Sequence, residues 1–425
     1  MEHLKPTRMR LFVVAAVLAW SAIGARAAET CAVNGKTWSL CGTDDGGWGF
    51  ENGKYCIARS FCPANRGAMP TLATRSTPVD PKANRKTRAL YSYLLSVWGK
   101  KIIAGQSDLT WLDAIDMAER VHADTGKYPA LMGYDFMNYG MSAEWAQGRR
   151  QTEEAIAFAK RGGLVEFSWH WRDPALLKTA RVNGAKFYAR EADSTKNTAF
   201  TIPLAEGALD QGSPAYRQID DAIDLIAVEL KKLSDAGVTV LWRPLHEASG
   251  AKGDGWFWWG RTRQDGAPQA FANILLWRHL YHRLVEVHGL HNLIWVWNGQ
   301  DPAWFPGDDV VDITSVDIYD STDSKDSKDK PTYRSQIEAY REARRATSEN
   351  KPIALSENSY IPDPDKLAAD GARWLWFMVW SDGAGAPGAT SPDNFWSGQY
   401  YNSDEHKRKV YQHADVITLD RLPAF

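Results

Sequence analysis

The chain has 425 residues, enough for two or three average domains or for one large barrel with additions. Its 50 basic and 52 acidic residues nearly balance, which argues against electrostatic binding to nucleic acid. The aromatic content is unusual, with 20 Trp beside 16 Tyr and 14 Phe. Aromatic faces suit the flat C–H faces of sugar rings, although large cores use aromatic residues as well.

The first 27 residues predict a secretory signal peptide. Three basic residues precede an apolar run at 11–23, and Ala25-Arg26-Ala27 fits a small-residue cleavage site. The run is too short for a confident membrane span, and no later segment reaches the required length. A retained helix or a lipid anchor is the alternative. We therefore expect a secreted protein without a membrane partner, cleaved near Ala27/Ala28.

All four cysteines fall within 32 positions directly after this signal, at Cys31, Cys41, Cys56 and Cys62. In an exported chain, an even and clustered set predicts disulfides in a small module with little core. A zinc site is the weaker alternative, because there is no CxxC pair and no histidine lies between the cysteines. We expect no metal. Three pairings are possible, of which we favour the nested one, Cys31–Cys62 with Cys41–Cys56.

The same segment, 28–66, holds more aromatic residues than so small a module can bury, so an exposed coplanar set would bind a flat ligand. From Cys31 to Cys62 its cysteine spacing, its GWG turn and its CIARS-x-C ending resemble carbohydrate-binding module family 10. The resemblance implies cellulose as ligand, stacked on Trp38, Trp48 and Phe50. Phe50 stands where that family usually has Trp. The alternative is a disulfide knot that packs its aromatic residues internally.

Residues 67–82 predict a linker, because they are rich in small and polar residues without apolar periodicity. From 83 to 425, eight short apolar runs alternate with helical stretches, of which Tyr216–Leu233 is the clearest. This alternation predicts a (β/α)8 TIM barrel. A doubly wound sheet is the alternative, but no glycine-rich phosphate turn follows the first run. The runs are 101–105, 129–136, 163–171, 238–247, 292–298, 310–319, 352–358 and 372–380.

Polar residues follow nearly every apolar run, and the pocket of such a barrel lies at these carboxyl ends of the strands. Side-chain alternation along strands also predicts that Glu166 and Arg243 pair in the layer beneath the pocket. The residues at the predicted strand ends are Gln106, Asp108, Asp135, His170, Glu247, Asn298, Asp317, Tyr319, Glu357, Trp380 and Asp382.

Two of these residues, Glu247 and Glu357, are the predicted catalytic pair. Glycoside hydrolysis needs one carboxylic acid to protonate the leaving oxygen and a second carboxylate to act at the anomeric carbon. On facing strand ends the two could lie about 5–5.5 Å apart, the separation of a retaining enzyme. Burial and the charge of Glu357 should keep Glu247 protonated, while Glu357 stays ionised and attacks.

The motifs at these positions resemble glycoside hydrolase family 26, whose members are mostly secreted retaining β-1,4-mannanases on a (β/α)8 barrel. The resemblance covers nearly all of 85–415. It implies that Glu247 is the acid/base and Glu357 the nucleophile. Loop 248–255 is longer than this family leads us to expect, which leaves the preference on the leaving-group side open. The matching motifs are WRPLHE (242–247), WFWWG (256–260), HNLIWVWN (291–298), VDIY (316–319), PIALSEN (352–358) and WFMVW (376–380).

The same resemblance implies roles for five further residues. His170 and His246 would contact the sugar nearest the scissile bond, and Tyr319 would donate a hydrogen bond to the nucleophile. Trp256 and Trp380 would stack on sugar rings. Each has a simpler alternative, in which the histidine satisfies a nearby polar group or the aromatic ring belongs to the barrel rim.

We therefore expect an endo-β-1,4-mannanase that acts on mannan, glucomannan or galactomannan and is held on cellulose by its N-terminal module. No cofactor is expected, and the oligomeric state is not indicated. One alternative is a related glycoside hydrolase that acts on β-1,3-xylan or mixed-linkage β-glucan. A second alternative, from another class, is a non-catalytic polysaccharide-binding barrel.

Overall fold

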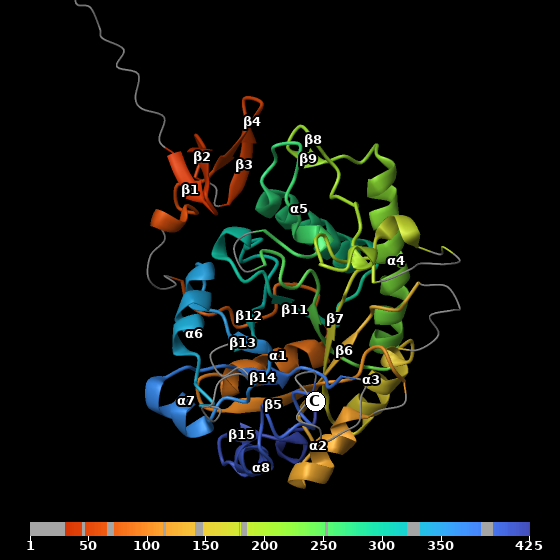
Figure 1. Cartoon of the computed structure of the whole chain (residues 1–425), viewed down its shortest axis with the longest axis vertical. Helices are drawn as coiled ribbons and strands as arrows, with labels where there is room; N and C mark the ends of the chain where they lie inside the picture. Colours follow the sequence, from red (N-terminus) through yellow and green to blue (C-terminus); the bar gives the residue numbers. More distant parts are fainter. Residues whose placement is uncertain are drawn as a thin grey trace, which may run out of the picture.

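The computed structural model consists of a small N-terminal sheet beside a closed barrel (Figure 1). The predicted signal peptide lies outside the described residues. Among the helices of the described part, none is both long and apolar enough to cross a membrane. The structure describes residues 30–44, 47–65, 72–113, 116–140, 148–177, 179, 185–250, 254–320, 332–383 and 394–425.

Eight parallel strands form the barrel, and the last pairs with the first to close the ring. This confirms the predicted (β/α)8 TIM barrel. Seven strands lie within their predicted apolar runs, and the first extends two residues past the end of its run. The runs are apolar because helices cover the outside of the ring and side chains fill its inside. The strands are β5 (Ile102–Ser107), β6 (Leu131–Asp135), β7 (Leu164–Ser168), β10 (Val240–Arg243), β11 (Leu293–Trp297), β12 (Ile313–Ile318), β13 (Ile353–Asn358) and β14 (Trp376–Val379).

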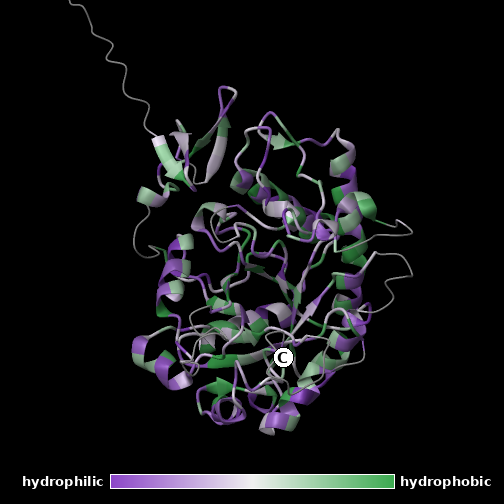
Figure 2. Ribbon diagram, viewed as in Figure 1, coloured by the Kyte–Doolittle hydropathy of each residue, from purple (hydrophilic) through white to green (hydrophobic). Residues whose placement is uncertain are grey.

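Helices surround the ring (Figure 1), and Figure 2 shows hydrophilic and hydrophobic residues alternating along the outer helices, as expected for helices with one buried and one exposed face. The predicted helix at 216–233 is α4, which begins earlier because Ser213 caps it and Pro214 occupies its first turn. The helices are α1 (Arg85–Val97), α2 (Met117–Thr125), α3 (Gln151–Lys160), α4 (Pro214–Asp235), α5 (Gln269–His282), α6 (Ile337–Ala343), α7 (Pro364–Asp370) and α8 (Asp404–Gln412).

Shorter elements complete the barrel. A hairpin of β8 (Leu204–Ala205) and β9 (Ala208–Leu209) precedes α4, and the short helix η7 (Pro302–Trp304) follows β11. Strand β15 (Val416–Ile417) adds to the start of β5. The hairpin and η7 are important below because the N-terminal sheet lies against them.

The N-terminal module is a four-stranded sheet in the order β1-β2-β4-β3. Its disulfides join Cys31 to Cys62 and Cys41 to Cys56, which confirms the nested pairing. Such cross-links replace the hydrophobic core that so short a segment cannot build. Its strands are β1 (Thr30–Val33), β2 (Lys36–Leu40), β3 (Trp48–Glu51) and β4 (Lys54–Ile57).

Much of the predicted linker is held against the barrel. Arg75 forms an ion pair with Glu349 at 2.9 Å. The backbone N–H of Val79 donates to the buried Asp312 at 2.7 Å, and Asp80 pairs with His291 at 2.8 Å. Residues 72–82 are therefore anchored along their length. Residues 66–71 lie outside the described residues.

Candidate active site

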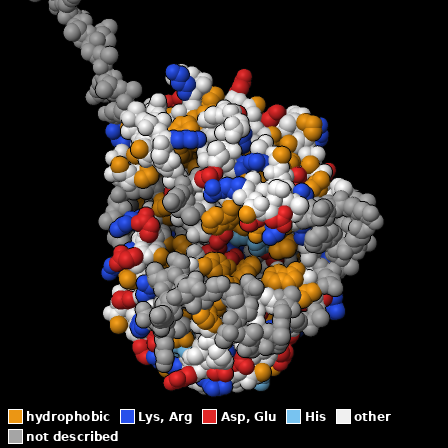
Figure 3. Space-filling model, in the orientation of Figure 1, with side chains coloured by type: hydrophobic (Ala, Val, Ile, Leu, Met, Phe, Trp, Pro, Cys, Tyr) orange, Lys and Arg blue, Asp and Glu red, His pale blue; other side chains and the backbone are white. Residues whose placement is uncertain are grey.

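The polar residues at the strand ends converge on a hollow in one face of the barrel. Figure 3 shows this hollow near the centre of the view, with acidic and histidine side chains at its floor and hydrophobic side chains around it. Within this hollow, one carboxylate oxygen from each of Glu247, Asp317 and Glu357 lies within 4.8 Å of the other two. The structure therefore brings the two predicted catalytic glutamates together, although 110 positions separate them in the sequence.

Glu247 is positioned by an irregular segment rather than by a strand. β10 ends at Arg243, and Leu245 and Glu247 adopt left-handed backbone conformations, with φ of 52° and 50°. Such conformations are rare outside glycine and collect at functional sites. The Glu247 N–H donates to both the backbone oxygen and the Oδ1 of Asn298, at 2.7 and 3.1 Å. The end of β11 thus fixes the segment that presents Glu247.

Glu357 is positioned by a bulge. It pairs with Asp317 across β12 and β13, and the register of these strands shifts between Val316 and Asp317. A bulge turns a side chain away from the direction that simple alternation would give it. Here it places two acidic residues from neighbouring strands at the floor of one pocket.

A buried arginine lies beneath these carboxylates. The Arg243 guanidinium donates to Glu166, which confirms the predicted pair, and also to Glu357 Oε1 at 2.9 Å. It lies 3.5 Å from Asp317. Tyr319 Oη donates to the other oxygen of Glu357 at 2.7 Å. Both oxygens of Glu357 therefore accept hydrogen bonds, one of them from a cation.

Glu247 has a different environment. Burial, followed by the charge of Glu357, raises the pKa of Glu247 to about 7. Its Oε2 accepts a hydrogen bond from Trp256 Nε1 at 2.9 Å, which opposes this rise only in part. Glu247 therefore keeps its proton to a higher pH than an ordinary glutamate does. Burial and the charge of Glu357 also raise the pKa of Asp317 well above its usual value.

Two histidines form a hydrogen-bonded chain beside the carboxylates. Asp135 accepts from His170 Nδ1 at 2.6 Å, and His170 Nε2 lies 3.2 Å from His246 Nε2. Burial opposes a charge on His170, but Asp135 outweighs it and raises the pKa of His170. Burial and the neighbouring His170 lower the pKa of His246 well below its usual value. His246 Nδ1 is buried and has no hydrogen-bond partner among the described residues.

Aromatic side chains border the same pocket. The Trp380 ring lies 6.0 Å from that of His170, and Trp256 contacts Glu247 as described. Tyr319 is 42 % exposed as a residue, and its hydroxyl donates to Glu357. The structure thus gathers all five predicted contact residues around the glutamates. Trp258 and Trp259 of the same motif are buried in the core.

Three contacts of this site were not predicted from the sequence. Asn298 anchors the backbone of Glu247, Arg243 binds Glu357, and Asp135 holds His170. Each is a polar residue within or directly after an apolar strand. That pattern marked them as candidates, but it did not identify their partners.

The loop after Glu247 packs closely on the WFWWG segment. A Cβ on Gly260 would lie 1.8 Å from the backbone oxygen of Ala248, so only glycine fits there. Residues 251–253 of the unexpectedly long loop 248–255 lie outside the described residues.

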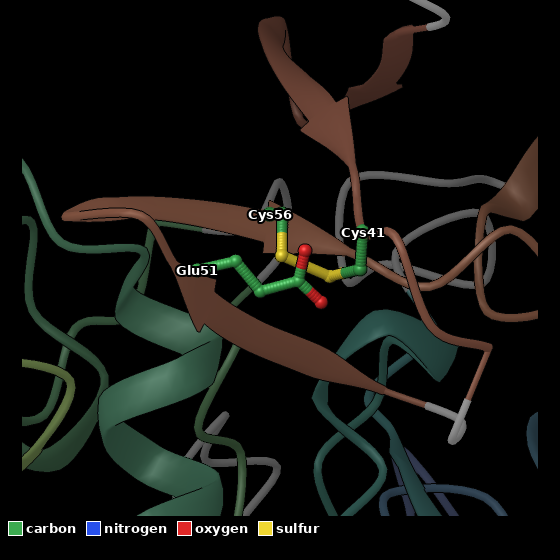
Figure 4. A group of neighbouring side chains, drawn as sticks. All are labelled: Cys41, Glu51 and Cys56. Carbon is green, nitrogen blue, oxygen red and sulfur yellow. A yellow bond between two sulfur atoms is a disulfide. The ribbon is translucent and has the colours of Figure 1, made fainter.

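Within the part of the chain that the structure describes, two groups of side chains could in principle hold a cation. The first is the carboxylate cluster, where the Arg243 guanidinium already supplies positive charge at Glu357 and Asp317. The second is Cys41, Glu51 and Cys56, but Figure 4 shows the two sulfurs joined in a disulfide, so they are not thiolate ligands. The geometry of the first group suits acid–base and nucleophilic chemistry at carboxylates.

The predicted cellulose-binding residues Trp38, Trp48 and Phe50 are all half-buried. The rings of Trp38 and Trp48 lie 5.2 Å apart at 89° and so are not coplanar. Trp48 Nε1 donates to the backbone oxygen of Ala303 in η7 at 2.9 Å, and Phe50 lies against Gly207 of the β8–β9 hairpin. In this structure the aromatic face contacts the barrel.

Comparison with known proteins places the barrel in a family. Residues 79–421 match glycosyl hydrolase family 26. A mannan endo-1,4-beta-mannosidase of Thermothelomyces thermophilus is 41% identical over 346 residues, which cover 81% of this chain and 62% of that protein. The chain thus spans about three fifths of the length of that relative.

Two of the many solved structures with a similar fold illustrate the likeness. The GH26-CBM35 beta-(1,4)-mannanase of Podospora anserina has 36% sequence identity and a TM-score of 0.65, covering 83% of this chain and 70% of that one. A beta-mannanase from a symbiotic protist of the termite Reticulitermes speratus, complexed with gluco-manno-oligosaccharide, has 30% identity and a TM-score of 0.65, covering 83% and 99%. The match over most of the chain is decisive: this chain belongs to glycosyl hydrolase family 26.

Proposed function

We propose that this chain is a retaining endo-β-1,4-mannanase that hydrolyses mannan, glucomannan or galactomannan by double displacement. The observation that carries the proposal is the approach of the Glu247 and Glu357 carboxylates within 4.8 Å, in different environments: burial raises the pKa of Glu247, whereas Glu357 accepts hydrogen bonds from Arg243 and Tyr319. An inverting enzyme needs room for a water molecule between its two carboxyl groups, and this short separation leaves none. The similarity to named mannanases supports the substrate class.

In the first step, Glu247 donates its proton to the glycosidic oxygen as the bond to the anomeric carbon breaks. Glu357 attacks that carbon from the opposite face and forms a covalent glycosyl-enzyme. The hydrogen bonds from Arg243 and Tyr319 orient its oxygens for this attack. Arg243 also forms an ion pair with Glu166. Its positive charge therefore keeps an anionic partner when Glu357 becomes a neutral ester.

In the second step, Glu247 acts as a base. Formation of the ester removes the charge of Glu357, one of the causes that raise the pKa of Glu247, so the pKa falls and Glu247 stays ionised. It then takes a proton from water, whose oxygen attacks the anomeric carbon and displaces Glu357. Two inversions return the sugar with its original anomeric configuration.

The histidine chain and the aromatic rings supply the sugar contacts in this proposal. His170 and His246 would contact the sugar nearest the scissile bond, and Trp256, Trp380 and Tyr319 would face pyranose C–H surfaces.

We further propose that the protein is exported and that its N-terminal module binds cellulose through Trp38, Trp48 and Phe50. Two disulfides suit an oxidising compartment, and the N-terminal charge and apolar pattern suits a cleaved signal near Ala27/Ala28. Such a module would raise the local concentration of wall polysaccharide at the active site.

A substrate panel tests the activity. We expect reducing ends from galactomannan and glucomannan, and none from β-1,3-xylan or lichenan. Proton NMR of the first products should show the β-anomer. Glu357→Ala is the matched control, and it should lose turnover but keep polysaccharide binding. Activity confined to xylan or lichenan would overturn the substrate, and undiminished turnover by Glu357→Ala would overturn the mechanism.

A further inference from the structure

The sheet face that carries the module's aromatic residues is covered by the barrel. Trp48 donates to Ala303, and the Tyr55 ring lies 5.5 Å from that of Phe271 in α5. Phe50 lies so close to Gly207 that a Cβ there would come within 2.4 Å of it. Figure 4 shows β3 passing above α5 and a neighbouring short helix. The three contacts reach three separate barrel elements.

The packing is continuous as well as specific. Buried residues of the module, among them Val33 and Ile57, belong to the same hydrophobic cluster as barrel residues such as Trp304. The chain also tethers the two parts, which gives the module an effective concentration near the barrel of about millimolar or more. Docking of this face is therefore favoured over its exposure to solvent.

The docked face cannot stack on a flat polysaccharide surface. Such stacking needs exposed rings in one plane. Here the Trp48 N–H is already donated to the Ala303 carbonyl, and Phe50 lies against Gly207, so the barrel occupies the face that would meet the polysaccharide. Two of the three residues that would bind cellulose, Trp48 and Phe50, thus contact the barrel directly.

We propose that the aromatic face of the module has two mutually exclusive partners, the barrel of its own chain and the flat face of cellulose, so that cellulose binding requires the module to leave the barrel. This inference rests on the cellulose binding proposed above and is independent of the proposed mannanase activity. Because only the released module binds, the apparent affinity of the intact chain is reduced by the fraction that is docked.

Barrel-side substitutions release the module without touching the aromatic residues that bind cellulose. Phe271→Glu places a charge against Tyr55, and Gly207→Asn adds a Cβ where Phe50 lies. Asn is chosen because it tolerates the left-handed φ of 78° found at Gly207. Val287→Glu is the matched control, because it adds the same charge at a side chain that is already exposed.

The experiment combines binding isotherms on microcrystalline cellulose with small-angle scattering, both on the full mature chain. We expect both release variants to bind about tenfold more tightly than the wild type and to show a larger radius of gyration. Val287→Glu should match the wild type in both measurements. Trp48→Ala should also enlarge the radius of gyration but gain no affinity, because it removes a cellulose contact too.

Three results would overturn the proposal. An unchanged radius of gyration in both release variants would show that these contacts do not hold the module. Equal cellulose affinity in released and wild-type chains would show that docking and cellulose do not compete. Absence of binding even in the released chains would show that the face is not a cellulose site. Hydrolysis of soluble galactomannan, measured on every variant, reports barrel folding and the proposed activity separately.

Discussion

At the scale of single residues, the site depends on two glutamates whose surroundings differ. Glu357 accepts from a cation and a phenol, whereas Glu247 is buried and, among the described residues, accepts from the neutral Trp256 N–H. The same chemical group can therefore be a proton donor at one position and a nucleophile at the other. Arg243 makes this difference possible because it supplies charge to one side of the pocket.

The alkaline limb of the pH profile should report Glu247. Its carboxyl must be protonated to act as the acid, and its pKa is raised to about 7. As the pH rises through 7 the proton is lost, so kcat/KM should fall about tenfold for each further pH unit. Kinetics on soluble galactomannan measure this. Activity that stays level to pH 9 would mean that another group donates the proton.

Asp135 should act as a positioning residue for His170. In Asp135→Asn the charge that outweighs burial is removed, so the pKa of His170 should fall below its ordinary value. Loss of a charged hydrogen bond costs about 1.5–3 kcal/mol, which corresponds to a decrease in kcat/KM of roughly 10- to 100-fold.

Proton NMR titration of the His170 ring distinguishes this role from a purely structural one. Ser168→Ala is the control, because Ser168 also donates to Asp135, at 2.6 Å, but carries no charge. A His170 titration that is the same in Asp135→Asn as in the wild type would refute the assignment.

At the scale of elements, loops and strand ends place the reactive groups. Asn298 at the end of β11 holds the backbone of Glu247, and the bulge in β12 aligns Asp317 with Glu357. The WFWWG segment closes against Ala248 through Gly260. These supports come from elements far apart in the sequence, so each depends on closure of the barrel.

Gly260→Ala should damage both stability and activity. Its new methyl group would need the space of the Ala248 carbonyl, which costs about 1–3 kcal/mol and displaces the segment between Glu247 and Trp256. Thermal unfolding and kcat measure the two effects. Gly212→Ala is the control, because a Cβ there meets only an ordinary contact at 3.4 Å. Equal melting temperatures for the two variants would contradict this account of Gly260.

The fold was predictable from the sequence because nearly every residue of the eight barrel strands is buried, so the strands appear as apolar runs. The polar residues after those runs also identified the pocket. The orientation of Glu247 was not predictable, because β10 ends at Arg243 and left-handed residues follow it. Side-chain alternation holds only within a strand, so it does not predict where side chains after Arg243 point.

The module shows a second limit of sequence analysis. Aromatic side chains such as Trp48 and Phe50 suit binding to a polysaccharide and packing on the barrel equally well, so their residue types do not identify the partner. Only the positions of Ala303 and Gly207 in the folded chain identify the partner seen here. These lie more than 150 positions away in the sequence.

At the scale of the whole molecule, the catalytic groups and the disulfides belong to different parts. Every residue of the pocket lies in the barrel, whereas all four cysteines lie in the module. Treatment with a reducing agent should therefore abolish cellulose retention while most hydrolysis of soluble galactomannan remains. Each disulfide contributes about 2–4 kcal/mol to the stability of what it closes. Parallel loss of both activities on reduction would mean that the barrel needs the module to fold.

The most direct test of the central claim is to trap the covalent intermediate. A 2-deoxy-2-fluoro-mannosyl or mannobiosyl fluoride carries a reactive leaving group but slows hydrolysis of the ester, so the glycosyl-enzyme accumulates. Peptide mass spectrometry then locates the attached sugar. We expect the added mass on Glu357, in the peptide that contains residues 352–358, and no labelling of Glu357→Ala. A sugar attached to Glu247 or Asp317 instead would contradict the assignment of the nucleophile.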